Sequence, residues 1–197
     1  HFGYSKVHLV GHDWGAMIAW WVTLHHPQAI SNLVVMNVPH PEVMKSHFYG
    51  SIRQLFRSWY VLLFQFPYLG EWIFSRNAGR TVSKYLLWTA KENTFGDESL
   101  DLYRRSWRRE GVPTGMLNWY RAAFRKPPVL SRNTRVSIPT LIIWGVMDVA
   151  LRRQMAEDSL AKCENGRLEL LPQASHWVQH DEPEKVNRLL LDWFSRR

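Results

Sequence analysis

The stretch that decides the fold is Val7-His8-Leu9-Val10-Gly11-His12-Asp13-Trp14-Gly15-Ala16. The apolar and β-branched run from Val7 to Val10 predicts a buried strand, and the residues from Ala16 to Trp21 favour a helix. Between them, the Gly11-x-Asp13-x-Gly15 spacing is that of a nucleophile elbow. Such an elbow is a tight strand-to-helix turn that lifts its central side chain above the edge of a sheet.

The central residue of this turn, Asp13, carries a carboxylate where many elbows carry a hydroxyl. A carboxylate can attack carbon directly to form an ester. The helix after it would point backbone N–H groups and a partial positive charge toward a developing anion. The ordinary alternative is a strand–turn–helix connection in which Asp13 only caps the helix. Residues further along the chain decide between the two.

Composition narrows the class of protein. The 197 residues are enough for one sizeable core, and the formal charge of +8 with 11 tryptophans permits an anionic membrane surface as a partner. The basic residues are scattered among acidic ones, so we expect no nucleic-acid partner. The single cysteine, Cys163, excludes an intramolecular disulfide. No run approaches the roughly 20 apolar residues that span a bilayer.

The start of the chain suggests a longer parent protein. The sequence begins at His1, and its first recognisable element is already the strand that feeds the elbow. An elbow strand with nothing before it would leave an open sheet edge, which whole domains usually pair or cover. We therefore expect the chain to be the C-terminal part of a longer protein.

The pattern along the chain predicts an α/β fold with a parallel sheet. After the elbow helix, buried strands are expected at 31–38, 139–145 and 167–171, with a helix at 152–162 and a final helix from Glu182. Residues 40–133 are strand-poor and aromatic-rich, which predicts a helical lid between two strands. The core would then comprise residues 1–39 and 134–197. Helices in the lid are expected at 47–56, 58–66, 68–74, 100–109 and 116–124.

Two polar residues share the elbow's edge of the predicted sheet. Asp148 and His176 each follow the C-terminal end of a predicted strand, as Asp13 does. Taken alone, Asp148 is typical of a loop turn, and His176 of a hydrogen-bonded loop histidine. Together the three stand in the order nucleophile, acid, base, which favours a triad in which His176 activates water and Asp148 orients the imidazole.

These residues carry a family resemblance. Gly11 to Gly15, the strand and loop from Leu141 to Asp148, and Ala174-Ser175-His176-Trp177 resemble the α/β-hydrolase epoxide hydrolases, most closely the vertebrate epoxide hydrolase 3 and 4 branch. The resemblance extends over essentially the whole chain. It implies the α/β-hydrolase fold with a helical cap, and an activity that opens an epoxide to a vicinal diol.

The resemblance also implies roles for single residues. Two lid tyrosines would donate hydrogen bonds to the epoxide oxygen, and the matching positions are Tyr60 and Tyr120. The backbone N–H of Trp14 would contribute to the oxyanion hole. No cofactor or metal is required, and the aromatic residues suggest an apolar epoxide, plausibly a lipid one. Members of this branch are anchored in the membrane, so a microsomal (endoplasmic reticulum) location is implied; otherwise the location would be cytoplasmic.

One departure from the family pattern bears on activity. The second oxyanion donor of the family comes from a His-Gly-x-Pro loop after an early strand, and the sequence contains no such segment. The early strands that would pair with residues 7–10 are absent too. We therefore expect these 197 residues alone to be inactive or poorly folded.

Two other functions remain open. A haloalkane dehalogenase uses the same aspartate nucleophile, but it holds a departing halide with ring N–H donors, so Tyr60 and Tyr120 favour epoxide opening. A non-catalytic reading makes the chain a membrane-associated or partner-binding remnant that uses its basic, tryptophan-rich lid. A serine esterase is excluded, because the elbow carries Asp13.

Overall fold

The computed structural model describes residues 3–50, 59–66, 68–75, 79–127, 129–130 and 133–195. Within these residues one sheet runs in the order β1-β2-β3-β4, and all neighbouring strands are parallel. The predicted parallel α/β fold is therefore confirmed. The strands are β1 (Val7–His12), β2 (Ile30–Met36), β3 (Thr140–Gly145) and β4 (Gly166–Leu171).

The register of the strands brings their carboxyl ends to one edge. His12 at the end of β1 lies beside Met36 of β2, and Met36 lies beside Ile143 of β3. Gly145, the last residue of β3, lies beside Leu171, the last residue of β4. The loops that follow the four strands therefore leave the sheet close together, which is where parallel sheets bind ligands.

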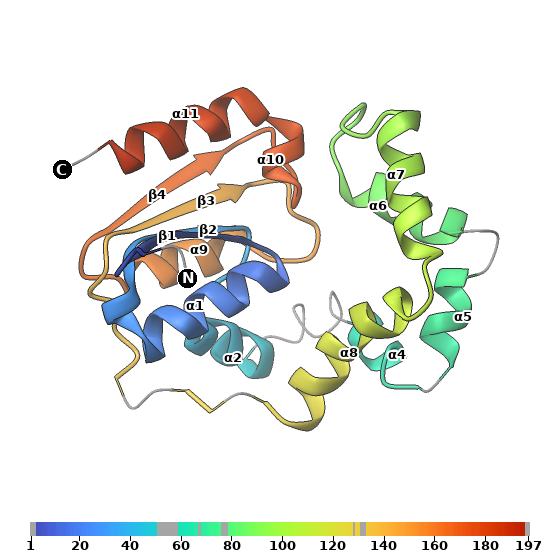
Figure 1. Cartoon of the computed structure of the whole chain (residues 1–197), viewed down its shortest axis with the longest axis horizontal. Helices are drawn as coiled ribbons and strands as arrows, with labels where there is room; N and C mark the ends of the chain where they lie inside the picture. Colours follow the sequence, from blue (N-terminus) through green and yellow to red (C-terminus); the bar gives the residue numbers. More distant parts are fainter. Residues whose placement is uncertain are drawn as a thin grey trace.

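Helices cover both faces of the sheet (Figure 1). On one face lie α1 (Trp14–His25), α2 (Pro41–Gly50) and α9 (Arg153–Leu160); α11 (Pro183–Phe194) covers the other. Alternate β2 residues point to opposite faces, so Val35 joins the core with Trp20 and Met155, and Val34 joins the one with Trp193. Two short elements, η1 (Pro27–Ala29) and α10 (Val178–Asp181), lie in the connections.

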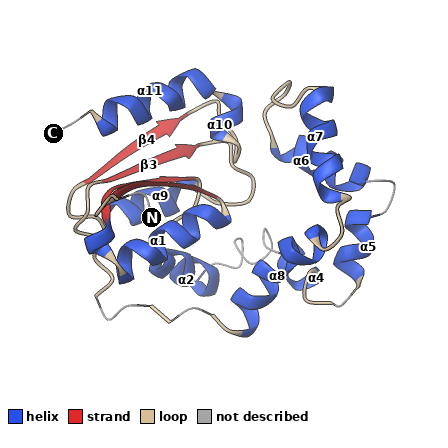
Figure 2. Cartoon of the chain, in the orientation of Figure 1, coloured by secondary structure: helices blue, strands red, loops and turns tan. Residues whose placement is uncertain are grey.

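A group of helices lies beyond the carboxyl ends of the strands (Figure 2). It has its own apolar cluster, which includes Phe74, Leu86 and Leu117. A half-buried ion pair, Arg121 Nη1 to Glu71 Oε1 at 2.6 Å, ties two of its helices together. The described residues between 40 and 133 contain no strand, as predicted. The helices are α4 (Trp59–Leu63), α5 (Leu69–Ser75), α6 (Arg80–Thr89), α7 (Asp97–Trp107) and α8 (Val112–Arg125).

Some helix boundaries differ from the sequence predictions. Helix α2 begins at Pro41 and not near residue 47, and its Val43 packs into the core cluster on the α1 face. The division of core from lid at residue 40 stays a prediction. Helices α6 and α10 were not predicted; half of the ten residues of α6 are apolar, and its Leu86 packs into the cluster with Phe74 and Leu117. The predicted helix over 47–56 falls largely outside the described residues.

No helix in the described part of the chain combines the length and apolar character needed to cross a membrane.

Candidate active site

The elbow holds Asp13 in a strained backbone conformation. Its φ is 50° and its ψ is −126°, values that a residue with a side chain rarely adopts. Gly11 makes the close turn possible, because a Cβ there would lie 2.5 Å from the carbonyl oxygen of Gly15. Asp13 occupies the N-cap position of α1, but its side chain makes no capping hydrogen bond. Its carboxylate, 43% exposed, therefore remains available to a ligand.

The structure brings the three predicted triad residues together. His176 Nδ1 lies 2.7 Å from Asp148 Oδ2, and His176 Nε2 lies 3.8 Å from Asp13 Oδ1. The Asp148 side chain is fully buried and that of His176 nearly so, whereas the Asp13 carboxylate faces outward. One side of the imidazole is thus fixed by a buried acceptor, and the other faces the carboxylate at the elbow. This is the geometry of an oriented base beside a nucleophile. The catalytic roles themselves stay predictions.

Asp148 is held by a set of donors that sequence reasoning only partly anticipated. The backbone N–H groups of Ala150 and Leu151 donate to its Oδ1 atom at 2.7 and 2.9 Å. Asn37 Nδ2 donates to its Oδ2 atom at 2.7 Å. Burial alone would raise the pKa of Asp148, but His176 and these donors lower it, so the carboxylate is ionised. Asn37 was not predicted; its position just past the end of β2 was the available signal.

Two neighbouring carboxylates raise the pKa of His176. Burial would lower the pKa of His176, but the carboxylates of Asp148 and Asp13 raise it to about 10. The pKa of Asp13 is lowered, because His176 and the backbone N–H of Trp14 outweigh the effect of burial. The two carboxylates therefore favour the protonated form of the imidazole. Neutralising either carboxylate would lower the pKa of His176, so that more of its imidazole would be in the neutral form that can accept a proton.

His12 supports the backbone of His176. Its Nε2 atom lies 2.8 Å from the carbonyl oxygen of His176, and Gln179 Nε2 donates to its Nδ1 atom at 3.2 Å. Burial and the neighbouring His176 lower the pKa of His12 to about 4, so its ring is neutral. The neutral ring then donates from Nε2 and accepts at Nδ1. Sequence reasoning missed this role, although His12 directly precedes the nucleophile.

Helix α8 places Tyr120 next to Trp14, the residue that follows Asp13. Burial and the charge of Asp13 raise the pKa of Tyr120, so its phenol stays protonated. Its ring stands edge-on to Trp14 with centroids 5.0 Å apart, and Trp14 stacks on Trp119 at 5.9 Å. A second edge-on contact at 5.0 Å joins Tyr120 to Phe64. A protonated phenol in an aromatic setting beside a carboxylate is suited to donate to a developing oxyanion.

The position of the second predicted tyrosine, Tyr60, is less well described. Tyr60 belongs to α4, but its side chain lies outside the described residues, so its role stays a prediction. A different tyrosine, Tyr85 of α6, was not foreseen. Burial raises its pKa, and so do the charges of Asp148 and Asp13, which places its phenol within electrostatic reach of both. Sequence reasoning had no signal for it, because α6 itself was not predicted.

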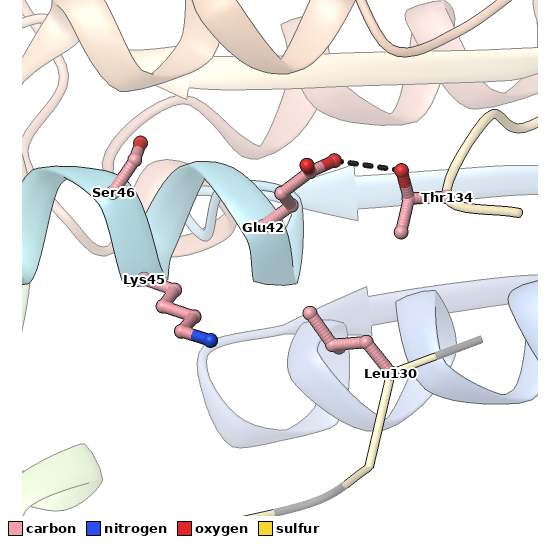
Figure 3. Close-up of a pocket in the computed structure, with 5 residues that line it drawn as sticks. All are labelled: Glu42, Lys45, Ser46, Leu130 and Thr134. Atoms are coloured by element: carbon pink, nitrogen blue, oxygen red, sulfur yellow. Dashed lines mark hydrogen bonds between the residues drawn. The ribbon is translucent and has the colours of Figure 1, made fainter. Parts of the chain in front are cut away.

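Three other features of the described residues were considered as ligand or reactive sites: metal-binding clusters, a surface hollow and Cys163. Among the described residues no group of three or more His, Cys, Asp or Glu side chains is placed to hold a metal ion. Residues of α2 line a surface hollow together with Leu130 and Thr134, and Thr134 Oγ1 donates to Glu42 Oε2 there at 2.7 Å (Figure 3). None of the triad residues lines it. Burial raises the pKa of Cys163 to about 12, so its thiol is a poor nucleophile.

Comparisons with known proteins agree with this geometry. Residues 1–183 match the family described as alpha/beta hydrolase fold. The chain is 36% identical over 196 residues to human (Homo sapiens) epoxide hydrolase 4, covering 95% of this chain and 53% of that protein. It is 33% identical over 193 residues to the AB hydrolase superfamily protein YfhM of Bacillus subtilis, covering 98% and 67%. The chain therefore spans about half the length of the human relative.

A solved structure is similar as well. The chain superposes on an epoxide hydrolase from Bacillus megaterium, solved in complex with an inhibitor, with a TM-score of 0.86 and 25% identity. The match covers 98% of this chain and 71% of that one.

Proposed function

The chain belongs to the α/β-hydrolase fold family, and on that premise we propose that its site converts an epoxide and water into a vicinal diol. One observation carries the proposal. A carboxylate, Asp13, stands at the elbow, with the imidazole of the Asp148-bound His176 at 3.8 Å. The names of the relatives support the same reaction.

The first step is opening of the ring. An oxygen of Asp13 attacks one epoxide carbon, the C–O bond of the ring breaks, and its electron pair goes to the ring oxygen. The phenol of Tyr120 donates a proton to that oxygen, and its raised pKa keeps the proton available. We assign the second donor to Tyr60, with Tyr85 as the neighbouring alternative. The product of this step is an alkyl ester on Asp13 that carries a free hydroxyl.

The second step is hydrolysis of that ester. His176 takes a proton from water, and the hydroxide attacks the ester carbonyl while the backbone N–H of Trp14 contributes to the oxyanion hole. The tetrahedral intermediate then collapses and the alcohol leaves as the diol. Of the two protons supplied by water, one stays on His176, which had given its earlier proton to the phenolate of Tyr120, and the other ends on the leaving alkoxide. The Asp13 carboxylate is regenerated, so atoms and charges balance without a cofactor.

Charge couples the two steps. While Asp13 is ionised, it helps to raise the pKa of His176 and keeps the imidazole protonated. Ester formation removes that negative charge, so the pKa of His176 falls and its proton passes to the phenolate that ring opening leaves on Tyr120. The neutral imidazole is then the base for hydrolysis. Asp148 remains ionised and continues to orient the ring.

The lid suggests the type of substrate. We propose that residues 40–133 form a cap domain whose aromatic residues Trp119, Phe64 and Tyr120 surround the reacting atoms together with Trp14 of α1. Such walls favour an apolar epoxide, and a lipid epoxide is the version that we put forward.

The decisive test uses the full-length protein, meaning the complete natural chain that contains residues 1–197. Incubation with a styrene-type epoxide should yield diol, and Asp13→Asn should abolish it. His176→Gln should trap the ester, seen as a mass increase of intact protein equal to the mass of the epoxide. Halide release from a haloalkane without diol formation would favour the dehalogenase alternative. Binding to liposomes that survives Asp13→Asn, with no turnover in the wild type, would favour the non-catalytic one.

Location is a separate part of the proposal. The resemblance implies a microsomal membrane, and the charge of +8 suits an anionic surface. Fractionation of cells that express the tagged full-length protein tests this: recovery in the microsomal pellet supports it, and recovery only in the supernatant contradicts it.

A further inference from the structure

The loop that carries His176 is tied to a single carboxylate on α10. Asp181 Oδ2 accepts hydrogen bonds from both the backbone N–H and the hydroxyl of Ser175, each at 2.6 Å. The Ser175 hydroxyl oxygen in turn accepts from the backbone N–H of Trp177 at 3.1 Å. Asp181 thus holds the residues on either side of His176, one directly and one through Ser175.

The other oxygen of the same carboxylate reaches the lid. Thr94 Oγ1 donates to Asp181 Oδ1 at 2.5 Å. Thr94 lies in the turn between α6 and α7, just after Asn93, whose φ is 64°. The Asp181 side chain therefore bridges the turn between α6 and α7 and the loop that carries His176, and both of its oxygens accept hydrogen bonds.

Further contacts between the lid and this loop lie around the bridge. Trp177 Nε1 donates to Thr89 Oγ1 at 3.0 Å, and the phenol of Tyr103 lies 3.2 Å from His180 Nε2. The ring of Phe95 packs edge-on against Trp177, with centroids 5.7 Å apart. All these lid residues come from the segment 89–103, and all their partners lie within 177–181. In Figure 1 the loop that joins α6 to α7 lies on the side that faces α10.

The ring and the carbonyl oxygen of His176 itself are held by residues of the core. Its Nδ1 atom is held by Asp148, and its carbonyl oxygen accepts from His12. The ring and the carbonyl are therefore anchored to the core, while the flanking residues depend on Asp181 and, through it, on the lid. A lid that lifts away from residues 177–181 must break the bond between Thr94 and Asp181.

We propose that Asp181 is a positioning residue for His176, and that its bond to Thr94 makes the seating of the lid part of that positioning. The kinetic consequences rest on the proposed function; the structural consequence does not. In the proposed reaction His176 acts as a base only during hydrolysis, so loss of the bridge should slow ester hydrolysis and leave ring opening unchanged. A 1 Å displacement of such a group is enough for a large rate effect.

The chain offers a matched pair of variants. Thr94→Val removes the donor to Asp181 and keeps the size of the side chain. Thr134→Val removes the bond from a threonine to Glu42, 2.7 Å long, at a place that does not touch the His176 loop. Thr94→Ser restores the hydroxyl and should rescue. Asp181→Leu removes every acceptor, whereas Asp181→Asn keeps an acceptor for Ser175 and can turn its amide toward Thr94.

Two measurements on the full-length protein decide the matter. The first is the downfield proton NMR signal of the His176 Nδ1–H group bonded to Asp148, which needs no substrate. The second is single-turnover kinetics, with ester followed by intact mass. In Thr94→Val and Asp181→Leu we expect the signal to shift or broaden, and ester hydrolysis to slow about 10-fold at an unchanged rate of ring opening. Thr94→Ser, Asp181→Asn and Thr134→Val should stay close to wild type.

The outcomes are distinguishable. If Thr94→Val and Asp181→Leu keep both the signal and the hydrolysis rate, Asp181 does not position His176 and the inference is wrong. If they change the signal but slow both steps equally, the effect is general loss of structure, which also overturns it. If the wild type forms no ester and no diol, the proposed function fails, and the NMR comparison of Thr94→Val with Thr134→Val alone decides the positioning role.

Discussion

Asn37 Nδ2 donates a hydrogen bond of 2.7 Å to Asp148 Oδ2, the same oxygen that lies 2.7 Å from His176 Nδ1. The amide oxygen of Asn37 also accepts from the backbone N–H of Gly145 at 2.9 Å. Asn37 has a φ of 50° and is fully buried. One amide at the end of β2 therefore joins the end of β3 to the acid of the triad.

Asn37→Asp should destabilise the fold and disturb the triad. The new carboxylate keeps an acceptor for Gly145 but places a like charge beside Asp148, which raises the pKa of Asp148. We expect a loss of about 2 kcal/mol in the free energy of unfolding, measured by urea denaturation. Asn32→Asp is the matched control, because Asn32 bonds His8 at the opposite, exposed end of the sheet. Equal losses in both variants would contradict the special role of Asn37.

Asp13→Asn should lower the pKa of His176. The substitution keeps the shape of the side chain and removes one of the two negative charges that hold the imidazolium, as ester formation would. Titration of the His176 ring signals by NMR gives the value directly. Asp158→Asn, which changes a carboxylate bonded to His47 elsewhere on the surface, should leave it unaltered. An unchanged pKa in Asp13→Asn would remove the proposed charge coupling between the two chemical steps.

The stability of the fold should depend on pH in a way set by this cluster. The raised pKa of His176 stabilises the fold fully below its unfolded value of 6.5, and this contribution is lost as the pH rises toward about 10. The lowered pKa values of Asp13 and Asp148 stabilise above 3.8 and are lost on acidification. Urea denaturation should therefore show wild-type stability falling from pH 6.5 to 10. His176→Gln should flatten that slope; a slope equal to that of wild type would show that other groups cause it.

Gly11→Ala and Gly15→Ala should behave differently, although both glycines belong to the elbow motif. A Cβ at Gly11 meets backbone atoms of Gly15 and Ala16 within 2.7 Å, whereas a Cβ at Gly15 meets nothing within 4 Å. We expect Gly11→Ala to cost about 1–3 kcal/mol of unfolding free energy, and Gly15→Ala to be close to neutral. Thermal and urea denaturation of the pair checks this, and a tolerated Gly11→Ala would mean that the turn relaxes.

Tyr120→Phe should slow ring opening by about 10-fold to 100-fold and leave ester hydrolysis unchanged, because only the first step needs the phenol. Tyr60→Phe and Tyr85→Phe, measured beside it in single turnovers, identify the second donor. The tyrosine whose loss slows the same step is that donor. Full ester formation in Tyr120→Phe at the wild-type rate would exclude Tyr120 from the reaction.

Much of this arrangement was predictable because its elements have strong local signals. Each of the four strands carries several apolar residues, although β4 also holds Arg167 and Glu169, and Asp13, Asp148 and His176 each follow the end of a strand. A parallel sheet then gathers them without further information. Helix boundaries between residues 40 and 133 were harder to predict, since the apolar residues of α6 gather in its second half, from Tyr85 to Trp88, and the helix packs against its neighbours α5 and α7.

The residues that sequence reasoning missed share one property. Asn37, His12 and Asp181 bond to partners that are distant in the chain: Asn37 to Asp148, His12 to His176 and Asp181 to Thr94. No local pattern encodes such pairs. Only Asn37 and His12 had a positional clue, because each borders the carboxyl end of a strand.

The connection from β2 to β3 has a consequence for how this architecture can change over time. Residues 37–139 form a long insertion between β2 and β3, which are hydrogen-bonded neighbours in the sheet. The entropy of closing such a loop grows only with the logarithm of its length, about 0.6 kcal/mol per doubling. Lengthening or shortening the insertion by tens of residues therefore has little effect on the free energy of pairing between β2 and β3. The length of this insertion can therefore vary in evolution, provided that the short segment 89–103 still reaches the loop after β4.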